Sequence, residues 1–160
     1  MIKEILKILE NDAQTTTKQI STMTSTPSAE VAKLIKQAEK DRIILKYKTV
    51  INWEKAGEEQ VWALIQVKIT PQPDVGFDSM AERIYRFPQA RTVYLVSGTY
   101  DLLVLVVGKT MHEVADFVSQ EIAHIEGVQE TITHFLLKRY KEDGEILEGE
   151  EGIKRQPVIL

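Results

Sequence analysis

The sequence predicts an α+β fold built from two units, and three observations support this prediction. Apolar residues recur at helical spacing before residue 41, whereas alternating and continuous apolar runs separated by turn residues dominate after residue 60. Residues 1–60 carry 10 basic and 9 acidic side chains, while residues 61–160 carry 10 basic and 15 acidic ones. Net charges of +1 and −5 indicate two units with different partners.

The composition excludes several classes of protein. No cysteine occurs among the 160 residues, so we expect no disulfide scaffold, thiol nucleophile or thiolate metal site. No apolar run approaches the roughly 18 residues that a membrane span needs. The opening residues, Met1 to Glu4, carry a charge of each sign and differ from a signal peptide. We expect a cytoplasmic protein without a metal, a cofactor or catalytic residues.

Two short helices are predicted at the start of the chain. The first presents one apolar face, made of Ile2, Ile5, Leu6 and Leu9. Thr16 and Gln19 then have the spacing of a capping box, in which the Thr16 hydroxyl accepts a hydrogen bond from the Gln19 N–H and the Gln19 side chain reaches back. The short helix that follows is expected to turn Ile20 and Met23 inward.

A third helix is predicted after a turn at residues 24–26. Pro27 suits the first helical position, and Thr26 can cap it. The helix has one apolar stripe, made of Val31, Leu34, Ile35 and Ala38, and an opposite polar stripe, made of Lys33, Lys36, Gln37 and Lys40. Ile43–Ile51 is rich in β-forming residues and is predicted to form a small basic ribbon with Tyr47 in its core.

This order of elements is that of a winged helix-turn-helix, whose third helix can enter the major groove of double-stranded DNA. We expect the helix start to meet base edges and the lysines to meet phosphates. The candidate DNA-binding residues are Lys18, Ser28, Ala29, Glu30, Lys33, Lys36, Lys40, Lys46 and Lys48. A solvated helix face is the alternative interpretation of the same stripe.

The rest of the chain alternates strands and helices. After a capped turn at Asn52–Gly57, strands are predicted at 61–69, 92–97, 102–107 and 129–140, with helices from Phe77 to Phe87-Pro88 and from Met111 to Gly127. The order β-α-β-β-α-β is the ferredoxin-like arrangement. We therefore expect a DNA-binding domain at 1–51, a linker at 52–60, a ferredoxin-like domain at 61–144 and a charged tail at 145–160.

One face of this sheet needs a second cover. Two helices can cover only one face, yet the strands at 92–97, 102–107 and 129–140 are apolar on both. A second copy of the same sheet can bury this apolar face without any other partner. We therefore predict a homodimer, with a tetramer or octamer possible. The chain end, Pro157–Leu160, is expected either to add an edge strand to a neighbour or to fray.

The chain resembles the Lrp/AsnC, or feast/famine, family of bacterial and archaeal transcription regulators. Residues 93–103 resemble the family's strand, Gly-x-Tyr-Asp turn and apolar strand, and residues 126–133 resemble its Pro-Gly-Val-x-x-Thr-x-Thr segment, with Glu126 in place of proline. Residues 137–144 also fit, and the N-terminal half matches in layout and at Asp12-Ala13, Glu39, Ile44, Tyr47 and Trp53–Gly57.

The resemblance implies a DNA-binding domain joined to a dimerisation domain that binds an amino acid or a related small molecule between subunits. By position, the effector-binding residues are Gly98, Thr99, Tyr100, Asp101, Thr131 and Thr133. Backbone N–H groups at the turn can hold an α-carboxylate, and Asp101 and the threonine hydroxyls can accept from an α-ammonium. A plain hairpin turn is the alternative interpretation of residues 98–101.

Two departures from the family pattern keep other functions open. Thr24 stands where the family usually has glycine, and Leu34 stands where it often has arginine. A metabolite-sensing oligomer without DNA binding is therefore one alternative. A sirohaem-decarboxylase-like enzyme on the same scaffold is another, with His112, His124 and His134 as candidates, although no two of them have metal-ligand spacing.

Overall fold

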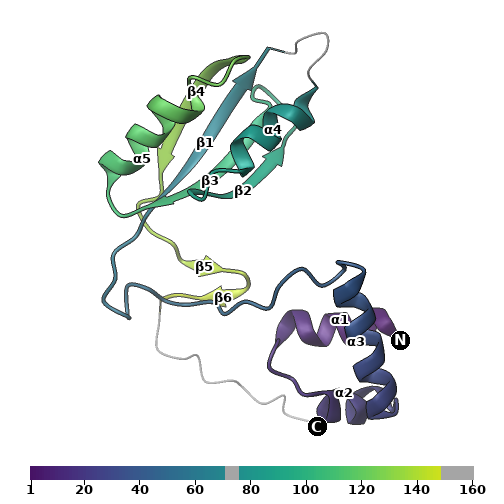
Figure 1. Cartoon of the computed structure of the whole chain (residues 1–160). Helices are drawn as coiled ribbons and strands as arrows, with labels where there is room; N and C mark the ends of the chain where they lie inside the picture. The colour runs from purple at the N-terminus through teal and green to yellow at the C-terminus, as the bar shows by residue number, and fades with distance from the viewer. Residues whose placement is uncertain (71–75, 149–160) are drawn as a thin grey trace. The chain divides into compact units, whose positions relative to one another are not determined.

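The computed structural model describes residues 1–70 and 76–148, and the chain divides between Val50 and Ile51 into two compact units. Figure 1 shows both: residues 1–50, here the helical unit, and the rest, here the sheet unit. The helical unit contains α1 (Ile2–Asn11), α2 (Thr17–Thr24) and α3 (Ser28–Lys40). No helix in the described ranges is long and apolar enough to cross a membrane.

The core of the helical unit comes from the predicted apolar stripes. Ile5, Leu9, Ile20 and Val31 are buried, and Ile8, Leu34, Ile35 and Ile44 pack against them. The capping box is confirmed, because Thr16 Oγ1 accepts from Gln19 N at 3.3 Å while Thr16 N donates to Gln19 Oε1 at 2.8 Å. The inward position of Met23 is wrong: α2 has only eight residues and buries Ile20, which leaves Met23 63% exposed.

The start of α3 lies one residue later than predicted. Pro27 has an extended ψ of 134° and is the N-cap, so the helix begins at Ser28. The Pro27 carbonyl accepts the first helical hydrogen bond, from Val31 N at 3.0 Å. Thr26 does not cap this helix, because Pro27 holds the N-cap position, and the Thr26 hydroxyl donates to the Thr24 carbonyl at 3.2 Å.

The predicted ribbon at Ile43–Ile51 is wrong, because these residues form no strand. Helix α3 ends in a Schellman motif: Arg42 adopts a left-handed φ of 57°, and Ile43 N donates to the Ala38 carbonyl at 2.9 Å. The chain then runs extended, and Tyr47, 44% exposed, bonds to a helix instead of filling a ribbon core. High β-propensity reflects the fit to a pleated, half-buried surface, and no second strand supplies that surface here.

The sheet unit has the predicted ferredoxin-like order of elements. These are β1 (Val61–Ile69), α4 (Phe77–Tyr85), β2 (Ala90–Leu95), β3 (Leu102–Gly108), α5 (Met111–Phe117) with a π-helical turn (Val118–Ile122), and β4 (Val128–Phe135). The strands form one antiparallel sheet in the order β2-β3-β1-β4. The last strand ends five residues earlier than predicted, at Phe135, which pairs with Ala63 near the start of β1.

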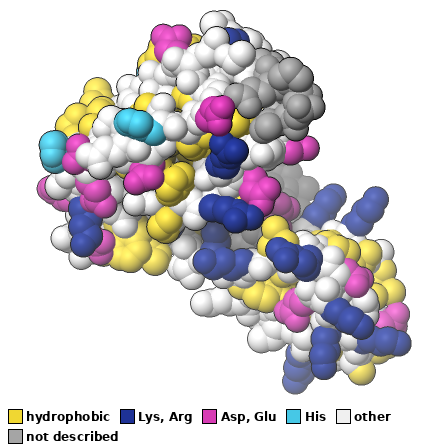
Figure 2. All heavy atoms as spheres, turned by 45° about the horizontal axis from the view of Figure 1, so that its top comes forward, with side chains coloured by type: hydrophobic (Ala, Val, Ile, Leu, Met, Phe, Trp, Pro, Cys, Tyr) yellow, Lys and Arg dark blue, Asp and Glu magenta, His cyan; other side chains and the backbone are white. Residues whose placement is uncertain are grey.

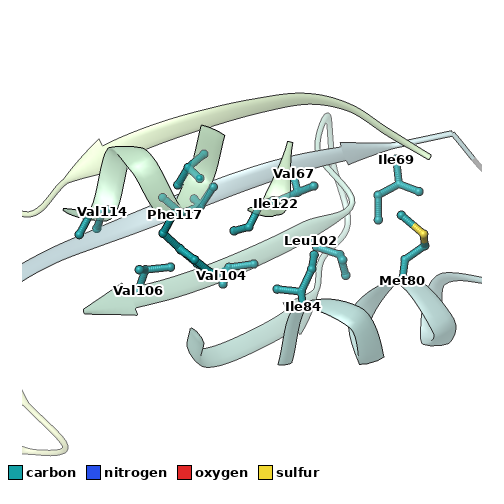
Figure 3. Close-up of a cluster of buried hydrophobic side chains, with 13 residues drawn as sticks. Val67, Ile69, Met80, Ile84, Leu102, Val104, Val106, Val114, Phe117 and Ile122 are labelled. Atoms are coloured by element: carbon teal, nitrogen blue, oxygen red, sulfur yellow. The ribbon is translucent and has the colours of Figure 1, made fainter. Parts of the chain in front are cut away.

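Both helices cover the same face of the sheet (Figures 1 and 3). The core between them holds alternate residues of β1 and β3, among them Ile65, Val67, Leu102 and Val104, with Met80, Ile84, Val114 and Ile122 from the helices. The other face of the sheet, here the open face, carries the strand residues that alternate with these core residues. In β3 these are half-buried: Leu103, Leu105 and Val107. Met111 begins α5, as predicted, and is 55% exposed.

A small hairpin follows the sheet. Strands β5 (Lys141–Glu142) and β6 (Glu145–Ile146) pair around Asp143 and Gly144, which both have positive φ values, of 45° and 89°. Two left-handed central residues make the tight turn that suits a two-residue hairpin. The predicted start of the tail at residue 145 therefore falls inside a hairpin. The predicted behaviour of Pro157–Leu160 lies outside the described residues.

Candidate functional sites

The helical unit presents its candidate DNA-binding residues to solvent. Residues 28–30 at the start of α3 are exposed, and so are Lys33, Lys36 and Lys40, on the side away from buried Val31 and Ala38. Within residues 1–70 and 76–148 none of these three lysines forms an ion pair. Their charges are therefore available to phosphate groups.

The charge of the helical unit agrees with this surface. Residues 1–50 carry nine basic and six acidic side chains, and Figure 2 shows Lys and Arg side chains spread over the visible face of this unit. Lys18, at the second position of α2, is exposed. Lys46 and Lys48 are exposed as well, but they lie on the extended segment after α3 and not on a wing.

The two departures in the helix-turn-helix have structural explanations. Leu34 packs against the core of the helical unit, so an arginine contact with DNA is absent there. Thr24 is still helical, and its hydroxyl donates to the Ile20 carbonyl at 2.8 Å. The left-handed residue of the turn is Ser25, with a φ of 51°. The conformation that favours glycine is thus present, one residue after Thr24.

In the sheet unit, the turn at residues 98–101 connects β2 to β3. Asp101 Oδ2 accepts a hydrogen bond from Ile69 N at 2.8 Å and lies 3.6 Å from Lys68 Nζ. The same ammonium donates to the Thr99 carbonyl at 2.8 Å. The Asp101 carboxylate therefore fixes the turn to β1, and its contact with the α-ammonium of an effector stays a prediction.

The turn borders a cavity of about 260 Å³. The lining residues are Gln66, Val96, Ser97, Thr99, Tyr100 and Leu103. Gly98 has a φ of 121°, a conformation that side chains rarely adopt. In the described part of the chain no hydrogen bond uses the backbone N–H groups of residues 97–100. A row of unused N–H groups beside a cavity suits a carboxylate.

The strand register places the two groups of predicted effector-binding residues, those at 98–101 and the two threonines at 131 and 133, on different faces of the sheet. Thr131 pairs with Val67 and Thr133 with Ile65, both of which are core residues under the helices. Residues directly opposite each other in an antiparallel pair share a face of the sheet. Thr131 and Thr133 therefore lie on the helix-covered face, whereas the cavity opens on the other face, beside Gln66 and Leu103.

Four cavity residues were missed by the sequence prediction: Gln66, Val96, Ser97 and Leu103. Gln66 stands directly opposite Leu103 in the β1–β3 pair, so both side chains lie on the open face beside the turn. The sequence pattern could indicate only that Gln66 faces away from the core, because it alternates with the apolar residues of β1. Its position beside the turn follows from the strand order.

The three histidines are not brought together as a catalytic or metal site. His112 Nε2 lies 3.2 Å from Asp116 Oδ2 on α5, and His124 Nδ1 lies 2.8 Å from the Ser119 carbonyl. His134 Nε2 lies 3.4 Å from Gln66 Oε1. No group of three His, Asp or Glu side chains in residues 1–70 and 76–148 has the arrangement of a metal site.

Comparisons with known proteins agree on one family. The family model described as the Lrp/AsnC ligand binding domain matches residues 62–146. The uncharacterized HTH-type transcriptional regulator YugG of Bacillus subtilis is 44% identical over 153 residues, which are 95% of this chain and 92% of the relative. The HTH-type transcriptional regulator FL11 of Pyrococcus furiosus is 28% identical, and the match covers 90% of this chain and 92% of FL11.

Solved structures share the fold. The leucine response regulatory protein LrpA of Mycobacterium tuberculosis has a TM-score of 0.75 at 18% identity, covering 92% of this chain and 97% of the other. A transcriptional regulator of Neisseria meningitidis in complex with L-Met has a TM-score of 0.70 at 22% identity, covering 88% of this chain and 90% of the other. At these identities the likeness shows the fold of the chain.

Proposed function

The chain belongs to the Lrp/AsnC family of transcriptional regulators, and we propose that α3 carries its contacts with double-stranded DNA while the turn at residues 98–101 takes an amino-acid effector. The observation that carries the first part is the exposed lysine stripe of α3, at positions 33, 36 and 40, opposite a buried apolar stripe. In this arrangement residues 28–30 approach base edges and the lysines approach phosphates.

The amino-acid effector is supported by the chemistry of the turn. The unused N–H groups of residues 97–100 suit an α-carboxylate, and the hydroxyls of Ser97, Thr99 and Tyr100 can accept from an α-ammonium. Relatives solved with L-methionine point to the same ligand class. Gly98, Thr99 and Tyr100 form the ligand side of the turn, and Asp101 holds its shape. Thr131 and Thr133 lie on the opposite face of the sheet from this turn, so within one chain they do not line the same cavity.

We also infer that two copies of the sheet unit associate through the open face. Half-buried Leu64, Leu103, Leu105 and Ile132 lie there, and Tyr94 is 59% exposed. Because the cavity opens on this face, a partner would close it. Effector binding would then shift the equilibrium between assemblies by its different affinity for each of them.

The two halves of this proposal have separate tests. Binding of the full chain to the DNA upstream of its own gene, measured at low salt, tests the regulator function, because phosphate contacts are strongest there. A thermal-shift screen of the twenty amino acids tests the effector, since a ligand that binds the native state raises the melting temperature with concentration. Amino-acid binding without any DNA binding would favour the metabolite-sensing alternative, for which the packed Leu34 is the supporting observation.

A further inference from the structure

Among residues 1–70 and 76–148, no charged side chain lines the cavity beside the turn. Two lining residues are apolar, Val96 and Leu103, and four are neutral and polar, Gln66, Ser97, Thr99 and Tyr100. A ligand side chain that enters a cavity loses part of its hydration, and a charge that loses hydration needs an opposite charge or several hydrogen bonds in return. This lining therefore suits an uncharged ligand side chain.

Two charged side chains beside the turn, those of Lys68 and Asp101, are already paired with each other. Asp101 Oδ2 accepts from Ile69 N at 2.8 Å and lies 3.6 Å from Lys68 Nζ, which itself donates to the Thr99 carbonyl at 2.8 Å. Both side chains are thus committed to fixing the turn. Neither Lys68 nor Asp101 therefore serves as the counter-charge for an ammonium or a carboxylate on the ligand's side chain.

Among the described lining residues, Gln66 alone has an amide side chain. It lies in the middle of β1, opposite Leu103 on one side and Ile132 on the other. Its Oε1 is 3.4 Å from Nε2 of His134, which comes from β4. In the histidine tautomer that carries its proton on Nε2, this oxygen accepts from His134, and the amide nitrogen keeps its two N–H donors for a ligand.

We propose that Gln66 is a specificity-determining residue of this cavity and that the cavity accepts amino acids with uncharged side chains. This inference rests on the proposed amino-acid effector and adds the class of side chain. A carboxylate introduced at Gln66 would face the ligand, whereas the other polar lining groups in the described part of the chain are hydroxyls.

The test compares binding of methionine, glutamine, lysine and glutamate to the full chain by isothermal titration. The native protein is expected to bind methionine or glutamine at least tenfold more tightly than lysine and glutamate. In Gln66→Glu, lysine binding should strengthen by about tenfold or more, because the new carboxylate supplies a counter-charge. Gln129→Glu is the matched control, since it adds the same charge at an exposed position of β4 and should leave the ratios unchanged.

A second variant covers the case in which Gln66→Glu does not fold. Gln66→Leu removes the amide donors without adding charge, so the affinity for glutamine should fall relative to that for methionine. Native binding of lysine or glutamate as tight as that of methionine would overturn this inference alone. An unchanged glutamine-to-methionine ratio in Gln66→Leu would do the same. Absence of binding by all twenty amino acids would instead overturn the proposed effector, and this inference with it.

Discussion

The Tyr47 hydroxyl donates a hydrogen bond to Glu39 Oε1 over 2.8 Å, and this contact ties the extended segment after α3 back to the helix. Ile44 packs on the core of the helical unit beside it. Together with the Schellman motif at Arg42, these contacts hold a segment that contains Lys46 and Lys48 although no strand supports it.

Replacing Tyr47 by phenylalanine removes the hydrogen bond and keeps the ring. The expected loss in the free energy of unfolding is about 0.5–1 kcal/mol, the low range for a partly exposed hydrogen bond. Urea denaturation of the full chain measures it. Tyr85→Phe is the control, because Tyr85 is 55% exposed on α4 and should change the unfolding free energy by less. Equal effects of the two substitutions would contradict the role given to Tyr47.

The same contact predicts a pH dependence. Partial burial, and then the hydrogen bond and negative charge of Glu39, raise the pKa of Tyr47 above its usual value of 10.0. The protonated hydroxyl is therefore favoured in the folded state, so its contribution to stability is present below pH 10 and is lost as the pH rises through the folded pKa. The difference in melting temperature between the native protein and Tyr47→Phe should shrink above pH 10. A difference that grew with pH would contradict this sign.

The left-handed conformation of Ser25 predicts a stabilising substitution. Ser25 has a φ of 51° at the C-cap of α2, where glycine avoids the steric cost that other residues incur. Ser25→Gly is expected to raise the unfolding free energy by up to about 1 kcal/mol, the remainder being lost to the entropy of glycine in the unfolded chain. The control, Thr22→Gly, lies inside α2 and should destabilise by about the same amount. Thermal melts that ranked the two variants in the opposite order would refute this interpretation.

Asp101 predicts a graded pair of substitutions. Asp101→Ala leaves the N–H of Ile69, a residue that is 3% exposed, without its acceptor, and the expected cost is about 1–3 kcal/mol. In Asp101→Asn the amide oxygen can still accept, so the loss should be well under that of the alanine variant. Denaturant unfolding of both variants measures this difference. If Asp101 served only the ligand, neither variant would change the stability of the ligand-free protein.

The open face predicts a change in assembly. Leu105 lies on β3 between Leu103 and Val107 on that face, so Leu105→Glu would place a charge in the proposed contact between copies. Sedimentation equilibrium should show a dissociation constant raised at least tenfold, and the monomer should keep its circular dichroism spectrum. Gln129→Glu, at an exposed position of β4, should leave the assembly unchanged. An unchanged dissociation constant for Leu105→Glu would place the contact elsewhere.

The periodic elements could be predicted from the sequence because the spacing of apolar residues records which side is buried. The stripe of Val31, Leu34 and Ala38 on α3 and the alternation of β1 both faced the core as expected. The ribbon after Lys40 could not be predicted reliably, because β-propensity depends on a partner strand that the sequence pattern does not reveal. The hairpin at 141–146 was missed although Asp143-Gly144 is a strong turn signal.

The candidate sites were predictable only in part. Exposure of Lys33, Lys36 and Lys40 follows from helical spacing alone. The cavity depends on strand order and register, which place Gln66 beside the turn and turn Thr131 and Thr133 to the opposite face. A motif locates a turn along the chain, but only the paired strands decide which side chains share a face with it.

The salt dependence of DNA binding is the sharpest test of whether the lysines of α3 contact DNA. The double variant Lys33→Gln/Lys36→Gln is compared with Lys3→Gln/Lys7→Gln, which makes the same charge change at exposed positions of α1. If the α3 lysines contact phosphates, the slope of log affinity against log salt should become shallower by about two in the first variant and stay native in the second. A native affinity and slope in the α3 variant would contradict the assignment of DNA binding to this helix.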